Sequence, residues 1–460
     1  MTNGAPTTTR PGGLLEVDEA LVDDIAALVR NDQEGMVRNL AADLYPADLA
    51  LLLRHVPRDV AQRLFSWLPP TQASDTLTEL EEDLRRFLLH EIDEPALTDL
   101  LDALDTDDAA DLLAELPDEV ALRVLPALED TDDLTELLDY GPETAGGLMA
   151  REFVAVPPTW TLAEVTEAVR AQAPDVDEMY AAFVVDADGV LLGVVSLKDL
   201  LLAPADRLVS SLMEPNFISV TTDIDQEEVA RVVQRYDLVS LPVLDERGRL
   251  MGRITIDDVV DVIRDEAEED IQIMSGLTGD EGTRDSVFRV SQGRLPWLLI
   301  GLLGSALSGT VIHSFEVQLQ QAVVLATFIP VVTAMGGNAA VQSAAIAVQG
   351  LSSGRLWMGD ILPRITKEMA VALLNGLVIA SILCGGVFLF NMGNVQRLML
   401  TIGLTMLLVS LVATTNGALI PFVLKKFGVD PASAMGPFVT TLNDIIGLTL
   451  YFFVAQFFYL

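Results

Sequence analysis

The sequence predicts a multidomain protein in three parts: an α-helical superhelix, a tandem pair of small α+β domains, and an α-helical transmembrane bundle of five helices. Three observations predict this organisation. Charge and hydropathy divide sharply along the chain, one segment of the acidic part occurs twice at a constant spacing, and five long apolar runs follow Leu295.

The division of charge separates a soluble part from a membrane part. The 460-residue chain has a net charge of -40 and a mean hydropathy of +0.39, a combination that one domain seldom shows. Only five acidic and six basic residues lie at or after Leu295, so 63 acidic and 22 basic residues precede it. The acidic part disfavours nucleic acid and anionic lipid headgroups as partners and favours cations or basic proteins. The bulk acidity also fits a salt-adapted composition, because only four of the 28 basic residues are lysines.

The N-terminal residues 1–13, MTNGAPTTTRPGG, are expected to be disordered. They contain no apolar core, so no cleavable signal peptide is expected. The single cysteine, Cys384, excludes an intramolecular disulfide framework.

Residues 14–148 predict an acidic helical domain. Segments such as ADLALLLRHV and DDAADLLAEL place apolar residues at spacings of three, four and seven. Asp and Pro stand at their starts, as helix caps and first-turn prolines do. A recurring pattern of this kind indicates stacked helices that build their core between neighbours.

An internal duplication follows the helical domain. FVVDADGVLLGVVSLKDLL (183–201) aligns with PVLDERGRLMGRITIDDVV (242–260) at an offset of 59 residues. Each copy predicts two strands around a D-x-x-G turn and then a helix, with a further helix upstream. The repeated βαββα pattern resembles a pair of CBS domains, assigned here to residues 149–211 and 212–261. Such pairs commonly sense a ligand, often an adenine nucleotide; the alternative is a duplicated scaffold that binds nothing.

A charged helix is predicted to connect the second copy to the membrane part, over residues 262–290. Around its start, Asp261, Asp265, Glu268 and Glu269 fall on one side or on adjacent faces. Like charges at these spacings destabilise an isolated helix. A solvated face tolerates them, and a bound divalent cation would relieve them.

Five apolar spans, each long enough to cross a bilayer, form the predicted membrane domain at 291–460. Their expected ranges are 295–313, 322–348, 369–391, 398–424 and 435–458. Eight Lys or Arg residues flank one side of the membrane, against Arg397 on the other. By the positive-inside rule, the acidic domains are cytoplasmic and the C-terminus is outside the plasma (inner) membrane.

Polar residues inside these spans are few. Asp444 is the sharpest signal, since hydrocarbon penalises an unpaired carboxylate and no basic residue of the predicted spans is available to pair with it. Its expected partner is a cation or a proton; the alternative is a helix–helix hydrogen bond by a protonated Asp. Small and polar residues elsewhere in the spans predict either close helix packing or the lining of an ion path. The candidate lining residues are Asn338, Asn416, Thr440 and Asn443.

Three separated motifs resemble the MgtE family of magnesium channels and transporters: GPETAGGLMAREFVAV, PVVTAMGGNAAVQSAA and DPASAMGPFVTTLNDIIGLTLYF. The resemblance covers the chain from about residue 14. It implies a homodimer with a pore between protomers and an aspartate in the last span, matched by Asp444. It also implies regulatory Mg2+ at cytosolic acidic residues that hold the pore shut. The matching positions are Asp107, Asp111, Asp258, Asp261, Glu266, Glu269 and Asp270.

The resemblance further implies ATP binding at the first CBS copy, near Lys198 and Asp199, where the Asp would take ribose hydroxyls. Two positions depart from the family pattern: Val341 and Gly436 stand where relatives often carry polar residues. Both departures reduce the polar lining and bear on the detail of ion coordination.

The function expected from these observations is a Mg2+ channel or transporter that imports Mg2+ and closes when cytosolic Mg2+ is high. A carrier coupled to H+ or Na+ and a CBS-based membrane sensor without transport are the alternatives. No enzyme is expected, because three histidines, one cysteine and no phosphate-loop motif offer little for a catalytic site. The sequence leaves open whether Mn2+, Co2+ or Ni2+ also pass.

Overall fold

A computed structural model describes residues 17–172, 179–277 and 287–460 of the chain. They fall into two compact units, one ending at Ile263 and the other beginning at Arg264. The segment expected to be disordered, 1–13, lies outside the described residues. So do 173–178 within the expected first CBS copy and 278–286 within the expected connecting helix.

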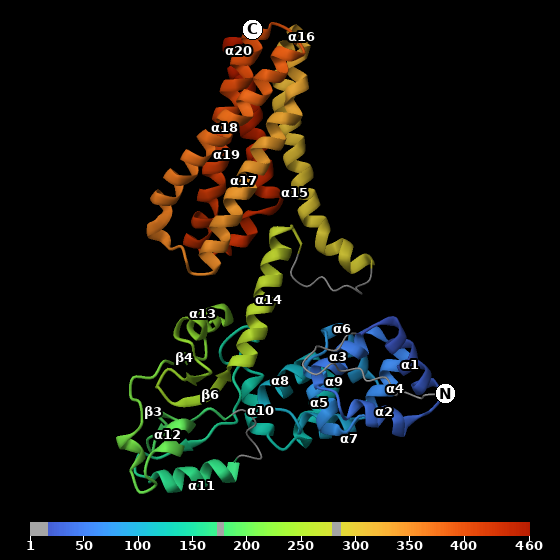
Figure 1. Cartoon of the computed structure of the whole chain (residues 1–460), viewed down its shortest axis with the longest axis vertical. Helices are drawn as coiled ribbons and strands as arrows, with labels where there is room; N and C mark the ends of the chain where they lie inside the picture. Colours follow the sequence, from blue (N-terminus) through green and yellow to red (C-terminus); the bar gives the residue numbers. More distant parts are fainter. Residues whose placement is uncertain (1–16, 173–178, 278–286) are drawn as a thin grey trace, which may run out of the picture. The chain divides into compact units, whose positions relative to one another are not determined.

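The first unit begins with the predicted helical domain, drawn in blue and cyan in Figure 1. Its helices are short because a proline or an acidic cap restarts the chain every ten or so residues: Pro46 and Pro70 open helices, and the side chains of Asp18 and Asp93 cap others. Leucine side chains at helical spacing fill the core, among them Leu49, Leu64 and Leu97. The described helices are α1 (Glu19–Arg30), α2 (Glu34–Ala41), α3 (Pro46–His55), α4 (Arg58–Phe65), α5 (Pro70–Thr78), α6 (Glu82–His90), α7 (Glu94–Leu101), α8 (Thr106–Glu115), α9 (Asp118–Val124) with the 3-10 turn η1 (Leu125–Ala127), and α10 (Thr131–Leu137).

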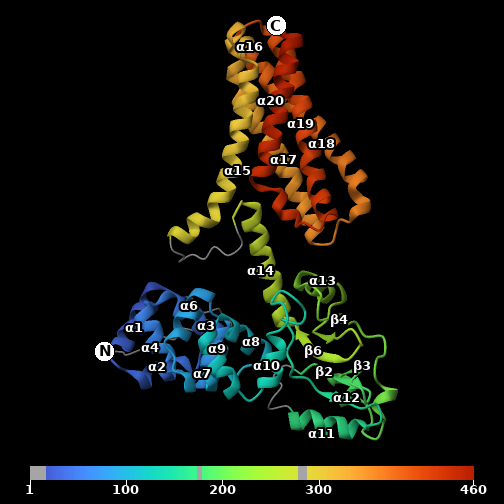
Figure 2. The same ribbon diagram turned by 180° about the vertical axis from the view of Figure 1, so that it is seen from behind.

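The duplication forms two small sheets with the same topology, which confirms the βαββα prediction. In each, the first strand pairs in parallel with the second, and the second pairs antiparallel with the third. The first copy consists of β1 (Ala155–Val156), α11 (Leu162–Gln172), β2 (Ala181–Val185), β3 (Leu191–Ser196) and α12 (Leu197–Leu202), with η2 (Val209–Ser211) after it. The second consists of β4 (Val220–Thr221), α13 (Gln226–Tyr236), β5 (Ser240–Leu244), β6 (Leu250–Thr255) and α14 (Ile256–Met274). Figure 2 shows both from behind.

The predicted turns explain the repeated D-x-x-G signature. Asp186 Oδ1 accepts hydrogen bonds of 2.9 Å from the backbone of residues two and four positions later, and Asp245 Oδ1 does the same at 2.8 Å. Gly189 and Gly248 close these turns with φ of +82° and +80°, a conformation that favours glycine. The two turns also pair with each other, because Leu191 N donates to Gly248 O and Leu250 N donates to Gly189 O.

The two copies exchange segments. Gly193 of β3 lies against Glu214 O, which follows η2, while Gly252 of β6 lies against Ala150 O, which precedes β1. Added Cβ atoms would sit 2.9 Å and 2.7 Å from these oxygens, so both glycines are required by close backbone approach. Residues just upstream of β1 therefore complete the second sheet and tie the two copies together.

The second unit contains the membrane helices, coloured yellow to red in Figure 1. Within the described residues, five helical segments are long and apolar enough to span a membrane, which confirms the predicted five-helix bundle. The elements are α15 (Val287–Ser314), α16 (Glu316–Gln321), η3 (Val323–Phe328), α17 (Ile329–Ser352), η4 (Met358–Asp360), α18 (Ile361–Leu389), α19 (Val395–Lys426), η5 (Pro431–Ala434) and α20 (Gly436–Phe458). α19 packs against α17, α18 and α20, and α15 packs against α20.

Candidate functional site

The candidate ion site in the membrane unit begins with Asp444 of α20. Its side chain is partly exposed, and it makes no hydrogen bond or ion pair within the described part of the chain. Thr440, one turn earlier on α20, is also partly exposed. A carboxylate without an internal partner in an apolar bundle fits a site that takes a partner from outside the chain.

Two glycines bring α17 against this part of α20. A Cβ built on Gly337 would lie 3.9 Å from Thr440 Cγ2, and one built on Gly336 would lie 3.9 Å from Asn443 O. The next residue, Asn338, has an exposed side chain on α17. The structure therefore brings the GGN segment of α17 and the TTLND segment of α20 together.

Asn416 and Asn443 join α19 to the same region. Asn416 Nδ2 donates to Asn443 Oδ1 at 3.4 Å, and Asn443 Nδ2 donates to Val439 O at 2.8 Å. Asn443 is only 2% exposed, so within one chain it points into the helix packing, in contrast to Asp444 beside it. Its amide links two helices around the candidate site.

The end of α14 that belongs to the second unit packs close to the start of α20. Ile273 and Met274 lie against an apolar cluster of Ala344, Val348 and residues preceding α20. At the next turn, Gly276 Cα approaches the Cβ position of Gly436 to 3.7 Å. The end of the charged helix therefore touches both helices that carry the candidate ion path.

Glu368 is a buried carboxylate that the sequence interpretation missed. The third span was expected from residue 369, but α18 begins at Ile361, so Glu368 lies inside it and is 6% exposed. It pairs with Arg364 and accepts a hydrogen bond from Ser343 of α17. The signal was present in the sequence as an Arg and a Glu four residues apart, a spacing that places both on one helix face.

The cytosolic candidates Asp107 and Asp258 meet within the first unit. Asp107 lies in the first turn of α8 and Asp258 in the first turn of α14. Burial, then the charge of Asp258 and then that of Asp108, raise the pKa of Asp107 well above its ordinary value. Burial chiefly raises the pKa of Asp258 to about 6 and that of Asp108 to about 7. Asp108 belongs to this group although the sequence interpretation did not select it.

The other predicted cytosolic residues lie nearby or on α14. The side chain of Asp111 is exposed, yet desolvation raises its pKa to about 6, with Arg85 opposing the rise. Burial and the charge of Asp105 raise the pKa of Glu152 to about 7. The remaining candidates, Asp261, Glu266, Glu269 and Asp270, all lie on α14.

The cluster is not a dehydrated metal cage. Within the described ranges, no three Asp, Glu, His or Cys side chains are grouped so that they could hold a metal ion. Mg2+ keeps several waters and is commonly bound through one or two carboxylates. A Mg2+ ion bound at the Asp107–Asp258 pair would therefore have to keep most of its waters.

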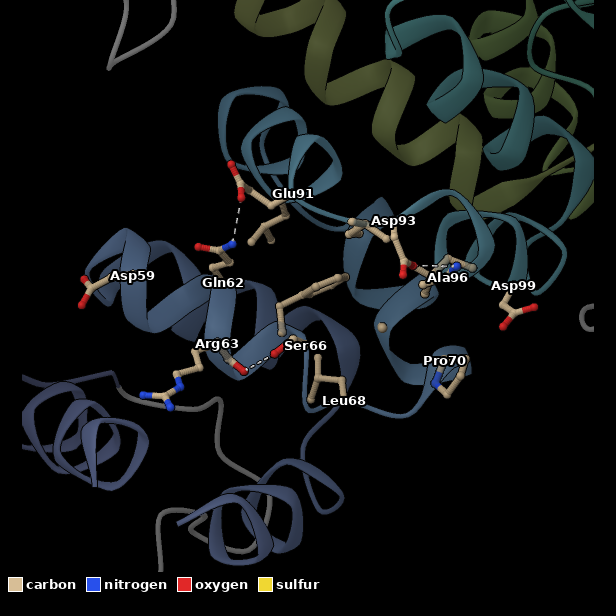
Figure 3. A pocket seen from close by; sticks show the side chains of 15 residues that line it. Asp59, Gln62, Arg63, Ser66, Leu68, Pro70, Glu91, Asp93, Ala96 and Asp99 are labelled. Atoms are coloured by element: carbon tan, nitrogen blue, oxygen red, sulfur yellow. Dashed lines mark hydrogen bonds between the residues drawn. The ribbon is translucent and has the colours of Figure 1, made fainter. Parts of the chain in front are cut away.

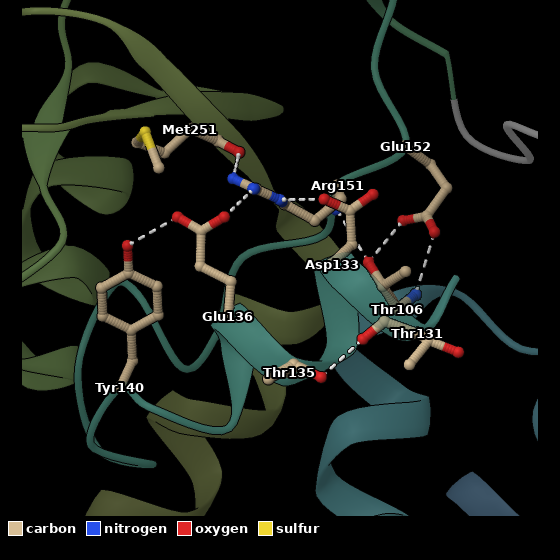
Figure 4. Close-up of polar contacts among 9 residues, drawn as sticks. All are labelled: Thr106, Thr131, Asp133, Thr135, Glu136, Tyr140, Arg151, Glu152 and Met251. Atoms are coloured by element: carbon tan, nitrogen blue, oxygen red, sulfur yellow. Dashed lines mark hydrogen bonds and ion pairs between the residues drawn. The ribbon is translucent and has the colours of Figure 1, made fainter. Parts of the chain in front are cut away.

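Arg151 fastens the helical domain to the second CBS copy, as Figure 4 shows. Its guanidinium contacts Asp133 at 3.1 Å and Glu136 at 2.5 Å on α10, and it donates to Met251 O on β6. The arginine side chain is 14% exposed, so these contacts are partly shielded from water. Beside it, Glu152 accepts hydrogen bonds from Thr106 N at 3.1 Å and Thr106 Oγ1 at 3.0 Å, at the start of α8.

The nucleotide candidate Asp199 sits in a capped turn. Ser196 Oγ donates to Asp199 Oδ2 at 2.6 Å and accepts from Asp199 N at 3.2 Å, while Lys198 is exposed. The second copy repeats this arrangement, since Thr255 Oγ1 donates to Asp258 Oδ2 at 2.7 Å. In that copy the carboxylate faces the acidic residues of α8. The two copies therefore present equivalent aspartates to different surroundings.

A groove of about 630 Å³ opens between helices α4 to α7 (Figure 3). Its apolar floor includes Phe65 and Leu88, and its rim includes Asp59, Glu91 and Asp99. Gln62 Nε2 donates to Glu91 Oε2 at 3.3 Å across it. Its lining includes none of the predicted cytosolic or nucleotide residues.

Comparison with known proteins covers all three parts of the chain. A family model described as divalent cation transporter matches residues 329–454, the MgtE intracellular N domain matches 44–143, and the CBS domain matches 145–206 and 209–265. The chain is 38% identical over 326 residues to the magnesium transporter MgtE of Thermus thermophilus, covering 70% of this chain and 72% of that protein. It is 35% identical over 334 residues to the magnesium transporter MgtE of Enterococcus faecalis, covering 71% of each.

A solved structure matches about half of the chain. It is the crystal structure of the cytosolic domain of the Mg2+ channel MgtE in complex with ATP, with 34% identity, a TM-score of 0.50, and coverage of 52% of this chain and 98% of that one. Together with the five apolar helices and the matches along the chain, these similarities show that the protein belongs to the MgtE family of divalent cation transporters.

Proposed function

We propose that this protein conducts Mg2+ across the plasma membrane into the cytosol as a homodimer. The membrane helices of each chain are embedded in lipid, the acidic N-terminal domains face the cytosol, and the C-terminus lies outside. The distribution of Lys and Arg among the connectors supports this orientation. Mg2+ is the transported ion of the relatives in Thermus thermophilus and Enterococcus faecalis, as their names state.

Asp444 carries this proposal. Its carboxylate has no internal partner among the described residues, and Thr440 and Asn338 present polar side chains in the same region of the bundle. A two-fold axis beside α20 would place two Asp444 carboxylates around one path. Two carboxylates acting on a hydrated Mg2+ suit an ion that gives up its waters reluctantly. Asn416 would support the path through its hydrogen bond to Asn443.

Cytosolic Mg2+ would close the path by binding the acidic residues. Asp107 and Asp258 repel each other when both are ionised, and a bound cation would remove that repulsion. Asp111, Asp261, Glu266, Glu269 and Asp270 would add negative charge on α8 and α14. A ligand that binds the closed arrangement better shifts the population toward it. The end of α14, which contacts α17 and the start of α20, would carry this change to the ion path.

ATP would bind at the first CBS copy. The solved relative holds ATP in its cytosolic domain, as its description states. Asp199 already has one carboxylate oxygen fixed by Ser196, which leaves its other oxygen for ribose hydroxyls, and Lys198 lies beside it for a phosphate. Titration of the full chain with ATP tests this site. Asp199→Ala should abolish binding and Lys198→Ala should weaken it, whereas binding unchanged in both variants would move the site elsewhere.

The decisive experiment measures Mg2+ flux into liposomes that contain the purified chain, with internal Mg2+ varied. The wild type should carry flux at low internal Mg2+ and lose it at high internal Mg2+. Asp444→Asn should abolish flux, and normal flux in this variant would remove the pore assignment. Single-channel currents would distinguish a channel from an H+- or Na+-coupled carrier, and absence of any flux would favour a sensor without transport. The same liposomes tested with Mn2+, Co2+ and Ni2+ establish which ions pass.

A further inference from the structure

Glu368 is a buried carboxylate of the membrane unit that the proposed ion path does not use. Its Oε1 lies 2.5 Å from Arg364 Nη2, one turn earlier on α18, and the two side chains are 8% and 12% exposed. Its Oε2 accepts a 3.0 Å hydrogen bond from Ser343 Oγ on α17, a residue only 2% exposed. Both carboxylate oxygens are therefore engaged, one within α18 and one across to α17.

The guanidinium of Arg364 depends on this carboxylate. Its Nε and Nη2 are buried and make no hydrogen bond of good geometry among the residues that the structure describes, so the close ion pair between Nη2 and Glu368 is the recorded interaction of this charge. Two charges in an apolar bundle are tolerated when each satisfies the other, and loss of one partner leaves the other buried and unpaired. Glu368 is thus held in place, and it holds Ser343 in turn.

Ser343 lies on the helix that carries the GGN segment. It follows Asn338 by five residues, or about 7.5 Å along the helix axis. N-terminal to Ser343, α17 contacts its neighbours through small residues that form no side-chain hydrogen bonds: Gly337 lies near Thr440, and Ala340 lies against Gly417. Such smooth contacts fix how closely helices approach but do little to fix rotation about the helix axis. The hydrogen bond from Ser343 to the carboxylate of Glu368 is directional and therefore restrains rotation of α17 about its axis.

Other contacts bear on the same half of α17. Its next residue, Ala344, packs with Ile273 and Met274 at the end of α14. Lys425 Nζ donates to Leu351 O at 3.0 Å near the C-terminal end of α17. The helix is therefore placed between an apolar contact with α14 and polar contacts with α18 and α19.

We propose that Glu368 is a positioning residue for ion transport: through Ser343 it fixes the rotation of α17, and with it the placement of Gly336, Gly337 and Asn338 against α20. Arg364, paired with Glu368 one turn earlier on α18, keeps the carboxylate oriented for this task. The inference rests on the proposed ion path beside Asp444, because the placement of α17 matters to transport through that path.

A double-mutant cycle on the full-length chain in liposomes tests the proposal. Ser343→Ala, Glu368→Gln and the double variant are compared by the KM for Mg2+ and by the ratio of Co2+ to Mg2+ flux. Each single variant should change KM or the flux ratio by about threefold to tenfold, and the double variant should resemble the singles, since both remove one interaction. A purely structural role would lower the amount of active protein, and hence the maximal flux, without moving KM or the ratio.

Two matched variants serve as controls. Ser343→Thr keeps the hydroxyl and should retain the wild-type KM and flux ratio. Ser381→Ala removes an exposed α18 hydroxyl that bonds to Leu377 O of its own helix, and it should change neither quantity. If Glu368→Gln gives no folded protein, the comparison of Ser343→Ala with Ser343→Thr decides the question.

Wild-type KM and flux ratio in Ser343→Ala, or effects that simply add in the double variant, would overturn the positioning role. Asp444→Asn measured alongside separates the two proposals. Normal flux in Asp444→Asn would remove the pore assignment whatever happens at Ser343. Loss of flux in Asp444→Asn together with unchanged kinetics in Ser343→Ala and Glu368→Gln would reject the positioning role alone.

Discussion

Asp107 of the helical domain and Asp258 of the second CBS copy lie close enough that the charge of Asp258 raises the pKa of Asp107. The two residues are 151 positions apart in the chain and come from domains of different fold. Asp258 occupies the place that Asp199 occupies in the first copy, in the first turn of the helix and bonded to a hydroxyl residue three positions earlier. One aspartate of the duplicated pair thus faces the acidic helical domain. The duplication therefore supplies two equivalent carboxylates that the protein can use for different purposes.

The pKa shifts predict that stability of the first unit falls as pH rises when Mg2+ is absent. The pKa of Asp258 is raised to about 6 and those of Asp108 and Glu152 to about 7, whereas the unfolded chain loses these protons near pH 4. Between these limits the folded state binds more protons, so the free energy of unfolding decreases with rising pH. Thermal unfolding of the full chain at about pH 5.5 and about pH 7.5 should show the lower midpoint at the higher pH.

Mg2+ should reverse this trend, because it binds the ionised carboxylates and competes with protons. The increase in melting temperature on adding Mg2+ should be small at about pH 5.5 and large at about pH 7.5. An increase that is equal at both values would contradict a regulatory site built from these carboxylates. K+ at matched ionic strength controls for charge screening.

We expect neutral variants of the Asp107–Asp258 pair to keep α8 and α14 in contact without Mg2+. Asp107→Asn and Asp258→Asn each remove one charge and keep an acceptor for the hydrogen bonds from Asp108 N and Thr255. In the absence of Mg2+, each should raise the melting temperature by roughly 2–4 °C per kcal/mol of repulsion removed. Each variant should also show a smaller increase in melting temperature when Mg2+ is added.

Asp59→Asn is the control for this pair. Asp59 is an exposed acid on the rim of the groove in the helical domain. It is distant in sequence from Asp107 and Asp258, and neither of those residues lines the groove. It should leave both the melting temperature and its response to Mg2+ unchanged. If all three variants behave alike, the effect arises from net charge and not from the pair.

Arg151→Met predicts a loosened attachment between the helical domain and the second CBS copy. The variant keeps much of the apolar stem but loses the contacts to Asp133, Glu136 and Met251 O. The three partners of the guanidinium would lose their hydrogen bonds to it, and we expect the free energy of unfolding to fall by about 1–3 kcal/mol. Thermal unfolding of the full chain should therefore start at a lower temperature.

Arg63→Met is the matched control for Arg151. Arg63 pairs with Asp32, but the two side chains are 48% and 70% exposed. A surface ion pair of this kind contributes about 0–1 kcal/mol. Equal destabilisation by the two variants would show that the shielded position of Arg151 is unimportant.

Local patterns in the sequence were sufficient to predict the three-part architecture. The D-x-x-G turns are encoded by Asp186 and Gly189 and by their repeats, because each turn satisfies its own backbone within five residues. The apolar spans are likewise properties of single helices. Features of this kind need no knowledge of distant contacts.

Long-range relationships could not be read in the same way. The exchange in which Ala150 completes the second sheet depends on a contact to Arg253, about 100 residues away. Asp108 and Glu152 join the acidic residues because of tertiary placement, not spacing. Glu368 was not predicted as a membrane residue, because hydropathy detects only the apolar centre of a membrane helix. The Arg364–Glu368 pair lies in the same helix, α18, but outside that apolar centre.

Gly417→Ala predicts a loss of membrane-domain integrity that helix propensity alone would not cause. A Cβ at Gly417 of α19 would collide with Ala340 O and lie 2.9 Å from Ala340 C on α17, and that backbone cannot move aside cheaply. Overpacking of this kind costs about 1–3 kcal/mol, against a propensity gain of about 1 kcal/mol from replacing glycine in a helix. Because Asn416 is adjacent and bonds to Asn443, the displacement should also disturb the ion path. Lower thermal stability in detergent and reduced Mg2+ flux are expected.

Gly385→Ala on α18 isolates the steric effect of the Gly417 substitution. No heavy atom lies within 4 Å of the Cβ position at Gly385, so the new methyl group enters open space. This variant gains the same helix propensity without a collision, and it should be as stable as the wild type or slightly more stable, with normal flux. Opposite shifts in melting temperature for the two variants would support the close contact between α17 and α19. Equal shifts in melting temperature would mean that the close contact between α17 and α19 does not need glycine at position 417. Other residues would then set the packing of α17.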